Sequence, residues 1–236
     1  NRFDTSMGMF KTALEWIDQT KDLVAAYKAN LAFWMDDLDY LEHIVAHIHS
    51  VSNAPVILDA KYGDIGNTAK KYAQWAYHRM NVDAVTINGF MGDEAILPFV
   101  TGEWSDRMGF VLVKTTAKTS HINVQELELC TGKIVYRKVM EQLNGLSKAE
   151  RLDNLGMVIG ATNLDPFLYP LPINTWILCP GIGAQGGNLE EAVKNNIRED
   201  KSGLLINVGR DIIESKNVRE KTLDYKDKIN EIRFSK

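Results

Sequence analysis

An acidic and a basic residue separated by a single position are the first feature of this sequence that could do chemistry. Asp59 and Lys61 follow an apolar run at residues 55–58. Because side chains on a strand alternate between its two faces, a carboxylate and an ammonium two residues apart point to the same side. Moving two such charges out of water costs free energy, so they are expected to be paired or to take part in a function. The pattern alone leaves open whether they form a structural ion pair or a reactive site.

A second lysine favours the reactive site. Lys28 closes the preceding apolar segment, so in a parallel sheet it would lie next to Asp59 and Lys61 at the carboxyl ends of neighbouring strands. In a row of alternating charges, an ammonium can be held ready to donate a proton while a carboxylate presses against an anionic substrate group. We therefore predict a catalytic row of Lys28, Asp59 and Lys61.

Glycines gather in a second region, near the C-terminal end. Residues 180–187 read Pro-Gly-Ile-Gly-Ala-Gln-Gly-Gly, and residues 207–210 read Asn-Val-Gly-Arg. Glycines allow backbone N–H groups to approach an anion closely, and the planar guanidinium of Arg210 suits a phosphate. A glycine-rich loop can also be a plain turn. However, the loops after strands seven and eight of an α/β barrel are a recurrent phosphate site, and these segments take those places if one earlier strand is counted.

The elements that must position these residues alternate between strand and helix. Helical spacing of apolar residues predicts helices around residues 10–17, 38–48 and 65–76. Compact apolar runs predict seven strands. The first runs from Leu23 into a polar end at residues 27–30, and the others lie at residues 55–58, 84–88, 110–114, 156–160, 175–179 and 204–208. This alternation implies a parallel sheet, either open and doubly wound or closed as a (β/α)8 barrel, for which seven strands are one too few. With no low-complexity linker, we expect one domain over residues 1–236.

Composition excludes several classes of function. A net charge of −4 gives no electrostatic reason to expect nucleic acid or an anionic membrane as partner. The two cysteines, Cys130 and Cys179, match no metal-ligand spacing, and the pair His43 and His47 lacks a converging third ligand, so we predict no metal site. No apolar run approaches the roughly 18 to 20 residues of a membrane span, and no signal peptide is evident. We expect a soluble, cytoplasmic protein.

Several of these segments together resemble one enzyme family. Residues 26–33, 58–68 and 180–187 are similar to the Ala-Tyr-Lys-x-Asn-x-Ala-Phe, Leu-Asp-x-Lys-x-x-Asp-Ile-Gly-Asn-Thr and Pro-Gly-Ile-Gly-Ala-Gln-Gly-Gly motifs of the orotidine 5'-monophosphate decarboxylases. The match runs in order from about Leu23 to Arg210 and includes further motifs at residues 88–92, 114–116 and 158–162.

The resemblance implies a TIM barrel, that is, a (β/α)8 fold. In that family the first strand ends in a Gly-Leu-Asp-Pro-like turn whose aspartate contacts the ribose, and nothing before Leu23 is similar to it. We therefore expect the sequence as given to begin after the first strand of the barrel.

The resemblance also implies an activity. It is the conversion of orotidine 5'-monophosphate to uridine 5'-monophosphate and carbon dioxide in de novo pyrimidine synthesis, without metal or organic cofactor. Asp59 would crowd the substrate carboxylate, and Lys61 would protonate C6 after carbon dioxide leaves. The residues implied to be catalytic are Lys28, Asp59, Lys61 and Asp64.

Further residues are implied to bind the substrate. Asn30 would lie on the ribose side, Thr116, and less strongly Thr115, at the pyrimidine edge, and Gln185, Gly209 and Arg210 around the 5'-phosphate, with Pro180 beside them. The resemblance implies a homodimer in which Asp64, Ile65 and Thr68 cross into the neighbouring subunit's site.

Two other functions remain alternatives. A metal-dependent sugar-phosphate decarboxylase or aldolase of the same superfamily shares the Asp-x-Lys-x-x-Asp strand but resembles a pattern with an acidic residue in place of Lys28. A non-catalytic barrel that binds nucleotides could dispense with Lys61. The sequence leaves open whether the domain is fused to an orotate phosphoribosyltransferase.

Overall fold

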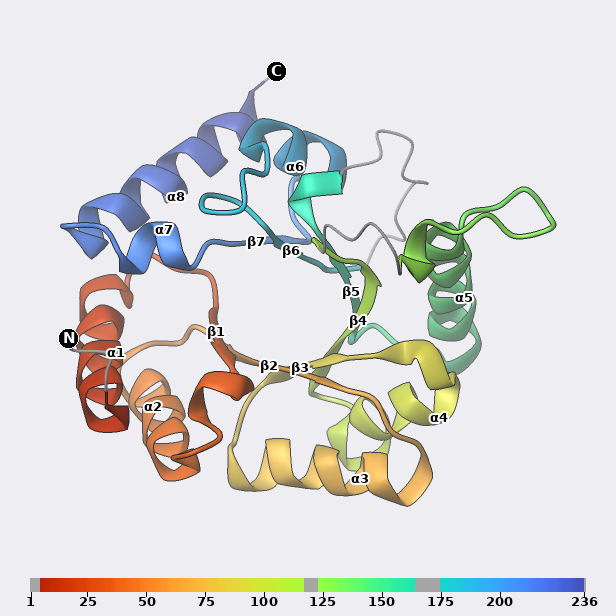
Figure 1. Cartoon of the computed structure of the whole chain (residues 1–236), viewed down its shortest axis with the longest axis horizontal. Helices are drawn as coiled ribbons and strands as arrows, with labels where there is room; N and C mark the ends of the chain where they lie inside the picture. Colours follow the sequence, from red (N-terminus) through yellow and green to blue (C-terminus); the bar gives the residue numbers. More distant parts are fainter. Residues whose placement is uncertain (1–4, 117–122, 164–174, 236) are drawn as a thin grey trace.

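Seven parallel strands form a nearly closed barrel in the computed structural model, which describes residues 5–116, 123–163 and 175–235. The strands pair in chain order and curve around a ring with the helices outside it (Figure 1). The prediction of seven parallel strands is confirmed, and the strands curve into a nearly closed barrel rather than an open doubly wound sheet. The strands are β1 (Tyr27–Asn30), β2 (Val56–Tyr62), β3 (Ala84–Ile87), β4 (Met108–Lys114), β5 (Leu155–Ile159), β6 (Ile177–Pro180) and β7 (Leu204–Asn207).

Helices occupy most of the intervals between the strands, as the apolar spacing predicts. In α2 the buried side chains are Leu41, Ile44, Val45 and Ile48, which lie on one helical face against the sheet. No helix in the described ranges has both the length and the apolar character needed to cross a bilayer. The α-helices are α1 (Ser6–Thr20), α2 (Leu38–Val51), α3 (Gly66–Gln74), α4 (Asp93–Ile96), α5 (Val135–Glu150), α6 (Leu189–Asn196), α7 (Arg210–Ile213) and α8 (Val218–Phe234).

Short helical turns occupy the ends of several strands and helices. The helix predicted over residues 65–76 changes after Gln74 into a π-helical turn, η2 (Trp75–Arg79). The other turns are of the 3-10 type and are η1 (Leu31–Trp34), η3 (Gly89–Met91), η4 (Leu97–Phe99), η5 (Gly102–Trp104), η6 (Val124–Glu126) and η7 (Ala161–Asn163).

Apolar side chains pack on both faces of the strands. The larger cluster lies between the strands and the surrounding helices. A smaller cluster takes one residue from each of five consecutive strands and fills the inside of the barrel with Ile57, Ala84, Phe110, Val158 and Leu178. A Cβ on Gly156 would lie 2.7 Å from the Phe110 ring, so this packing requires glycine there.

The first strand begins later in the chain than the sequence predicts. The prediction started it at Leu23 and ended it in the polar residues 27–30, but residues 23–26 connect α1 to β1, and pairing begins at Tyr27, whose N–H donates to the Pro55 carbonyl. The apolar character of residues 23–26 therefore does not mark a strand. The shift places Lys28 within β1 and Asn30 at its end.

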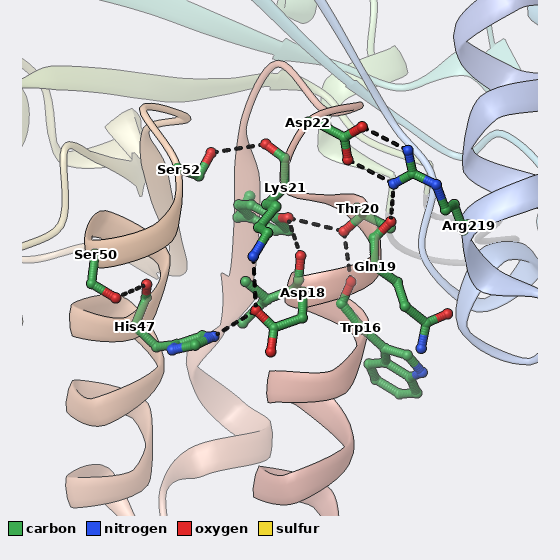
Figure 2. A network of polar contacts seen from close by, with 12 residues as sticks. Trp16, Asp18, Gln19, Thr20, Lys21, Asp22, His47, Ser50, Ser52 and Arg219 are labelled. Atoms are coloured by element: carbon green, nitrogen blue, oxygen red, sulfur yellow. Dashed lines mark hydrogen bonds and ion pairs between the residues drawn. The ribbon is translucent and has the colours of Figure 1, made fainter.

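Helices α1 and α8 lie side by side next to β1 and β7, where the barrel is not closed (Figure 1). We call this position the seam of the barrel. Among the described residues, β1 pairs with β2 and β7 pairs with β6, and no pairing joins β1 to β7. The Arg219 guanidinium donates to both carboxylate oxygens of Asp22, at 2.7 and 2.6 Å, and to the Gln19 carbonyl at 2.8 Å (Figure 2). This contact, called here the seam clasp, ties the end of α1 to the start of α8.

Candidate active site

A row of alternating charges crosses the carboxyl ends of β1 and β2. Lys28 Nζ lies 2.9 Å from Asp59 Oδ2, and Lys61 Nζ lies 2.6 Å from Asp59 Oδ1. The Asp59 side chain is only 12 % exposed and that of Lys28 16 %, whereas that of Lys61 is 48 % exposed. The structure thus brings the three residues together, with the carboxylate sheltered in the middle and Lys61 open to the mouth of the barrel.

The two ammonium groups keep the central carboxylate ionised. Burial raises the pKa of Asp59, but the charge of Lys28 and the hydrogen bonds from Lys61 and Lys28 outweigh it, and the pKa lies below its ordinary value. Asp59 is therefore a sheltered negative charge at neutral pH, facing the space in which a ligand would bind.

A third partner of Asp59 comes from β3 and is absent from the sequence prediction. Thr86, whose side chain is almost completely buried, donates from Oγ1 to Asp59 Oδ1 at 2.9 Å and accepts the Lys61 backbone N–H at 2.9 Å. The available signal was a hydroxyl in the otherwise apolar strand Ala84–Ile87, which neighbours β2. Thr86 fixes both the carboxylate and the backbone of the lysine beside it.

The backbone at Lys61 departs from a regular strand. Its φ of 52° lies in the left-handed region that non-glycine residues rarely adopt, and the pairing of β2 with β3 shifts register between Leu58 and Tyr62. Simple alternation therefore does not describe this strand end. Asp59 and Lys61 meet through an irregularity of the kind that is common beside active sites.

Four further predicted site residues lie at or after the ends of β1 and β2, and among the described residues none of them has a hydrogen bond or ion pair with the row. Asn30 accepts the Ala32 N–H at 3.1 Å and so caps η1, and Asp64 accepts the Ile65 N–H at 2.8 Å. Ile65 is 44 % exposed, and Thr68 is exposed on the first turn of α3. Within the described ranges, Asp64 forms no ion pair, which leaves its second oxygen open.

Thr116 lies where the ends of β4, β5 and β6 converge. A Cβ on Gly160 would lie 2.6 Å from Thr116 Cγ2, and one on Gly181 would lie 2.7 Å from the same atom. Both glycines are therefore required for the threonine to sit in this position. A Cβ on Gly181 would also lie 3.2 Å from Gln185 Oε1, because the glutamine side chain folds back over the loop.

The glycine-rich loop after β6 and the end of β7 lie together. Pro180 in β6 is in register with Asn207 in β7, so the two loops leave the barrel side by side. Gly209 and Arg210 are exposed, and Arg210 makes no ion pair with any residue in the described part of the chain. Its guanidinium is available to an anion.

An ion pair just before Thr116, in which only the lysine is buried, was also absent from the sequence prediction. The Lys114 side chain, 8 % exposed, has its Nζ 3.2 Å from Glu126 Oε1 and 4.2 Å from the centre of the Tyr136 ring. The Thr115 N–H donates to Gln125 Oε1 at 2.7 Å. Gln125 and Glu126 of η6 thus bind Thr115 and Lys114, the two residues that precede Thr116.

Known proteins with similar sequences share one description. The family model that matches residues 5–225 is that of the orotidine 5'-phosphate decarboxylase / HUMPS family. An orotidine 5'-phosphate decarboxylase of Aromatoleum aromaticum is 33 % identical over 234 residues, covering 94 % of this chain and 84 % of the relative. One of Haloarcula marismortui is 38 % identical over 206 residues, covering 84 % and 70 %.

Solved structures give the same picture. The chain is similar to Leishmania donovani UMP synthase, with a TM-score of 0.88 and 34 % identity, covering 99 % of this chain and 52 % of that one. It thus spans about half of that UMP synthase chain. A putative orotidine-monophosphate-decarboxylase of Toxoplasma gondii gives a TM-score of 0.87 and 31 % identity, covering 97 % and 85 %.

Proposed function

Because the chain belongs to the orotidine 5'-phosphate decarboxylase / HUMPS family, we propose that it decarboxylates orotidine 5'-monophosphate to uridine 5'-monophosphate in pyrimidine synthesis, without metal or organic cofactor. The observation that carries the proposal is the row of Lys28, Asp59 and Lys61 at the mouth of the barrel. It offers a fixed negative charge beside a proton donor, which is what this reaction needs.

The row supplies the chemistry as follows. The substrate carboxylate binds against ionised Asp59, and the repulsion between the two negative charges is relieved when carbon dioxide leaves. The electron pair that remains on C6 is stabilised by the Lys61 ammonium, which then transfers a proton to that carbon. Lys28 and Thr86 hold Asp59 in place throughout.

The other half of the barrel mouth binds the rest of the nucleotide. Gln185, Gly209 and Arg210, with the loop of residues 180–187, receive the 5'-phosphate, and we call this set the phosphate clamp. Thr116 contacts the pyrimidine edge and Asn30 the ribose side. Binding energy from the distant phosphate can hold the reactive geometry at C6.

The active unit is a homodimer in which Asp64, Ile65 and Thr68 reach the partner subunit's site. Large apolar side chains are exposed after three consecutive strands: Phe33 and Met35 after β1, Ile65 after β2, and Phe90 and Met91 after β3. Phe90 is 85 % exposed and Phe33 69 %, which is unusual for aromatic side chains without a partner. A second copy of the chain would cover this surface. Light scattering of the purified protein gives its mass and so tests whether a dimer forms.

Turnover tests the function directly. The loss of orotidine 5'-monophosphate absorbance is followed with the purified chain in excess chelator, for the wild type and for Lys61→Ala. Chelator-resistant turnover that Lys61→Ala loses supports the proposal. Turnover that requires a divalent metal, or a folded dimeric wild type that binds nucleotide without converting it, points instead to the sugar-phosphate enzyme or to the binding-only barrel.

A further inference from the structure

Asp211 directly follows Arg210 and is held by two side chains of α8. Tyr225 donates from Oη to Asp211 Oδ2 at 2.5 Å, and Lys221 Nζ lies 3.1 Å from the same oxygen. Lys221 also lies over the Tyr225 ring, at 5.2 Å from its centre. The residue after the guanidinium is thus anchored to the last long helix of the barrel.

The glycine-rich loop rests on the same aspartate. A Cβ on Gly183 would lie 2.8 Å from Asp211 Cβ and 3.2 Å from Tyr225 Oη, and the φ of Gly183 is 77°. Only glycine allows this backbone to come so close to Asp211. Asp211 therefore touches both parts of the phosphate clamp, the loop after β6 and the Arg210 segment after β7.

The charge of Asp211 opposes a phosphate nearby. The hydrogen bond from Tyr225, and then that from Lys221, hold the pKa of Asp211 below its ordinary value, so the carboxylate is ionised at neutral pH. A negative side chain one residue from the guanidinium that binds a phosphate dianion would repel that ligand. Lys221 places a compensating positive charge on the carboxylate.

We propose that Asp211 is the positioning residue of the phosphate clamp, joining Arg210 and the Gly183 loop to α8, and that Lys221 neutralises it so that it does not repel the 5'-phosphate. The inference rests on the proposed function and adds residues to the phosphate side of that same site. The two α8 residues have separate roles: Tyr225 anchors Asp211 through a hydrogen bond, and Lys221 neutralises its charge.

The anchor is tested with ligands that differ only in the phosphate. Tyr225→Phe removes the hydroxyl that anchors Asp211 and leaves the charges of Asp211 and Lys221 in place. Its binding of uridine 5'-monophosphate and of inorganic phosphate, measured by calorimetry, should weaken by about fivefold to tenfold, as expected for one lost hydrogen-bonded anchor. Binding of uridine, which has no phosphate, should stay unchanged. Equal weakening for uridine and its monophosphate would overturn the proposal, because it would indicate a general structural defect.

The charge is tested with a double-mutant cycle. Lys221→Gln leaves Asp211 uncompensated and should weaken inorganic phosphate binding by about threefold to tenfold at low salt, an effect that salt screens. Lys221→Gln combined with Asp211→Asn removes both charges and should recover most of the lost affinity, with the amide still able to hydrogen-bond Tyr225. A double variant as weak as Lys221→Gln would show that Lys221 does not act through Asp211.

Matched controls come from an exposed ion pair between α2 and η2, which has no part in the clamp. Arg79 Nη2 lies 3.2 Å from Asp39 Oδ1, and Asp39→Asn and Arg79→Gln should leave phosphate binding unchanged. Asp211→Asn keeps an oxygen that can accept the Tyr225 hydrogen bond, so it should not show this phosphate-selective loss. Because binding is measured without turnover, failure of this inference and failure of the proposed decarboxylation are seen separately.

Discussion

Lys28 Nζ lies 2.9 Å from Asp59 Oδ2 across the parallel pair of β1 and β2, and both side chains are largely buried. The charge of Lys28 is the largest of the influences that lower the pKa of Asp59 against the opposing effect of burial. The two residues therefore act together. The Lys28 ammonium on one carboxylate oxygen keeps Asp59 ionised, while the other carboxylate oxygen faces Lys61.

Removal of Lys28 should move the pH dependence of the reaction. In Lys28→Gln the pKa of Asp59 rises, because its largest stabilising charge is lost while burial remains. The acid limb of the profile of kcat/KM against pH should move to higher pH than in the wild type, and kcat/KM at neutral pH should fall by at least about a hundredfold. An acid limb that stays in place in the variant would mean that it does not report on Asp59.

Thr86 should affect kcat more than KM. Thr86→Val keeps the shape of the side chain but removes the hydrogen bonds to Asp59 and Lys61, so the row loses its fixed geometry. We expect kcat to fall by about tenfold, equivalent to about 1.4 kcal/mol, with KM little changed. Thr86→Ser keeps the hydroxyl and should recover most of the loss. Equal activity of the valine and serine variants would contradict a positioning role.

Mixing two inactive variants should restore activity if the site is shared between subunits. Lys61→Ala and Asp64→Ala should each be inactive, but a heterodimer of the two combines an intact Lys61 with an intact Asp64 in one of its two sites. After unfolding and refolding together, an equal mixture should recover about a quarter of wild-type activity, because half of the dimers then carry one complete site. Separately refolded variants are the control. A mixture as inactive as its components would place Asp64 in its own subunit's site.

Glu126 should support the pyrimidine side of the site and the stability of the chain. Glu126→Gln leaves the Lys114 ammonium buried without its carboxylate, which should cost about 1 to 3 kcal/mol in the free energy of unfolding, since Glu126 is itself partly exposed. The displaced strand end should weaken binding of uridine 5'-monophosphate but not of inorganic phosphate. Glu141→Gln breaks an exposed pair with Lys133 and should have a smaller effect on unfolding in urea.

The seam clasp should make stability depend on pH in the acid range. The hydrogen bonds from Arg219 lower the pKa of Asp22 from 3.8 to about 2. The clasp therefore stabilises the fold fully above pH 3.8, and this contribution is lost as the pH falls towards about 2. Asp22→Asn should be less stable than the wild type at neutral pH, and the difference should shrink over that window. Asp18→Asn, in the last turn of α1 and with longer contacts, is the control (Figure 2).

The sequence predicted the alternation of the barrel because each strand is a compact apolar run with a polar end. The same rule placed Lys28 and Asp59 side by side. It could not predict the positive φ of Lys61, whose N–H donates to the Thr86 hydroxyl of a neighbouring strand, because contacts between strands have no signal in the local pattern. It also missed the pair of Lys114 and Glu126, because apolar spacing does not link β4 to the turn η6.

The first strand was predicted to start too early for a related reason. Residues 23–26 are apolar, but strand pairing is a contact between distant segments, and the pairing with Pro55 and Val56 begins only at Tyr27. Local hydrophobicity marks which residues avoid water, whereas the register of β1 is set by the partner strand.

The seam clasp also constrains the order in which the protein folds. Arg219 and Asp22 are 197 residues apart in the sequence, so this contact closes a loop that contains almost the entire barrel. Contacts of such long range are entropically expensive to form early. During synthesis on the ribosome, α1 cannot contact α8 until almost the whole chain has been made. Formation of the clasp should therefore be among the final events of folding.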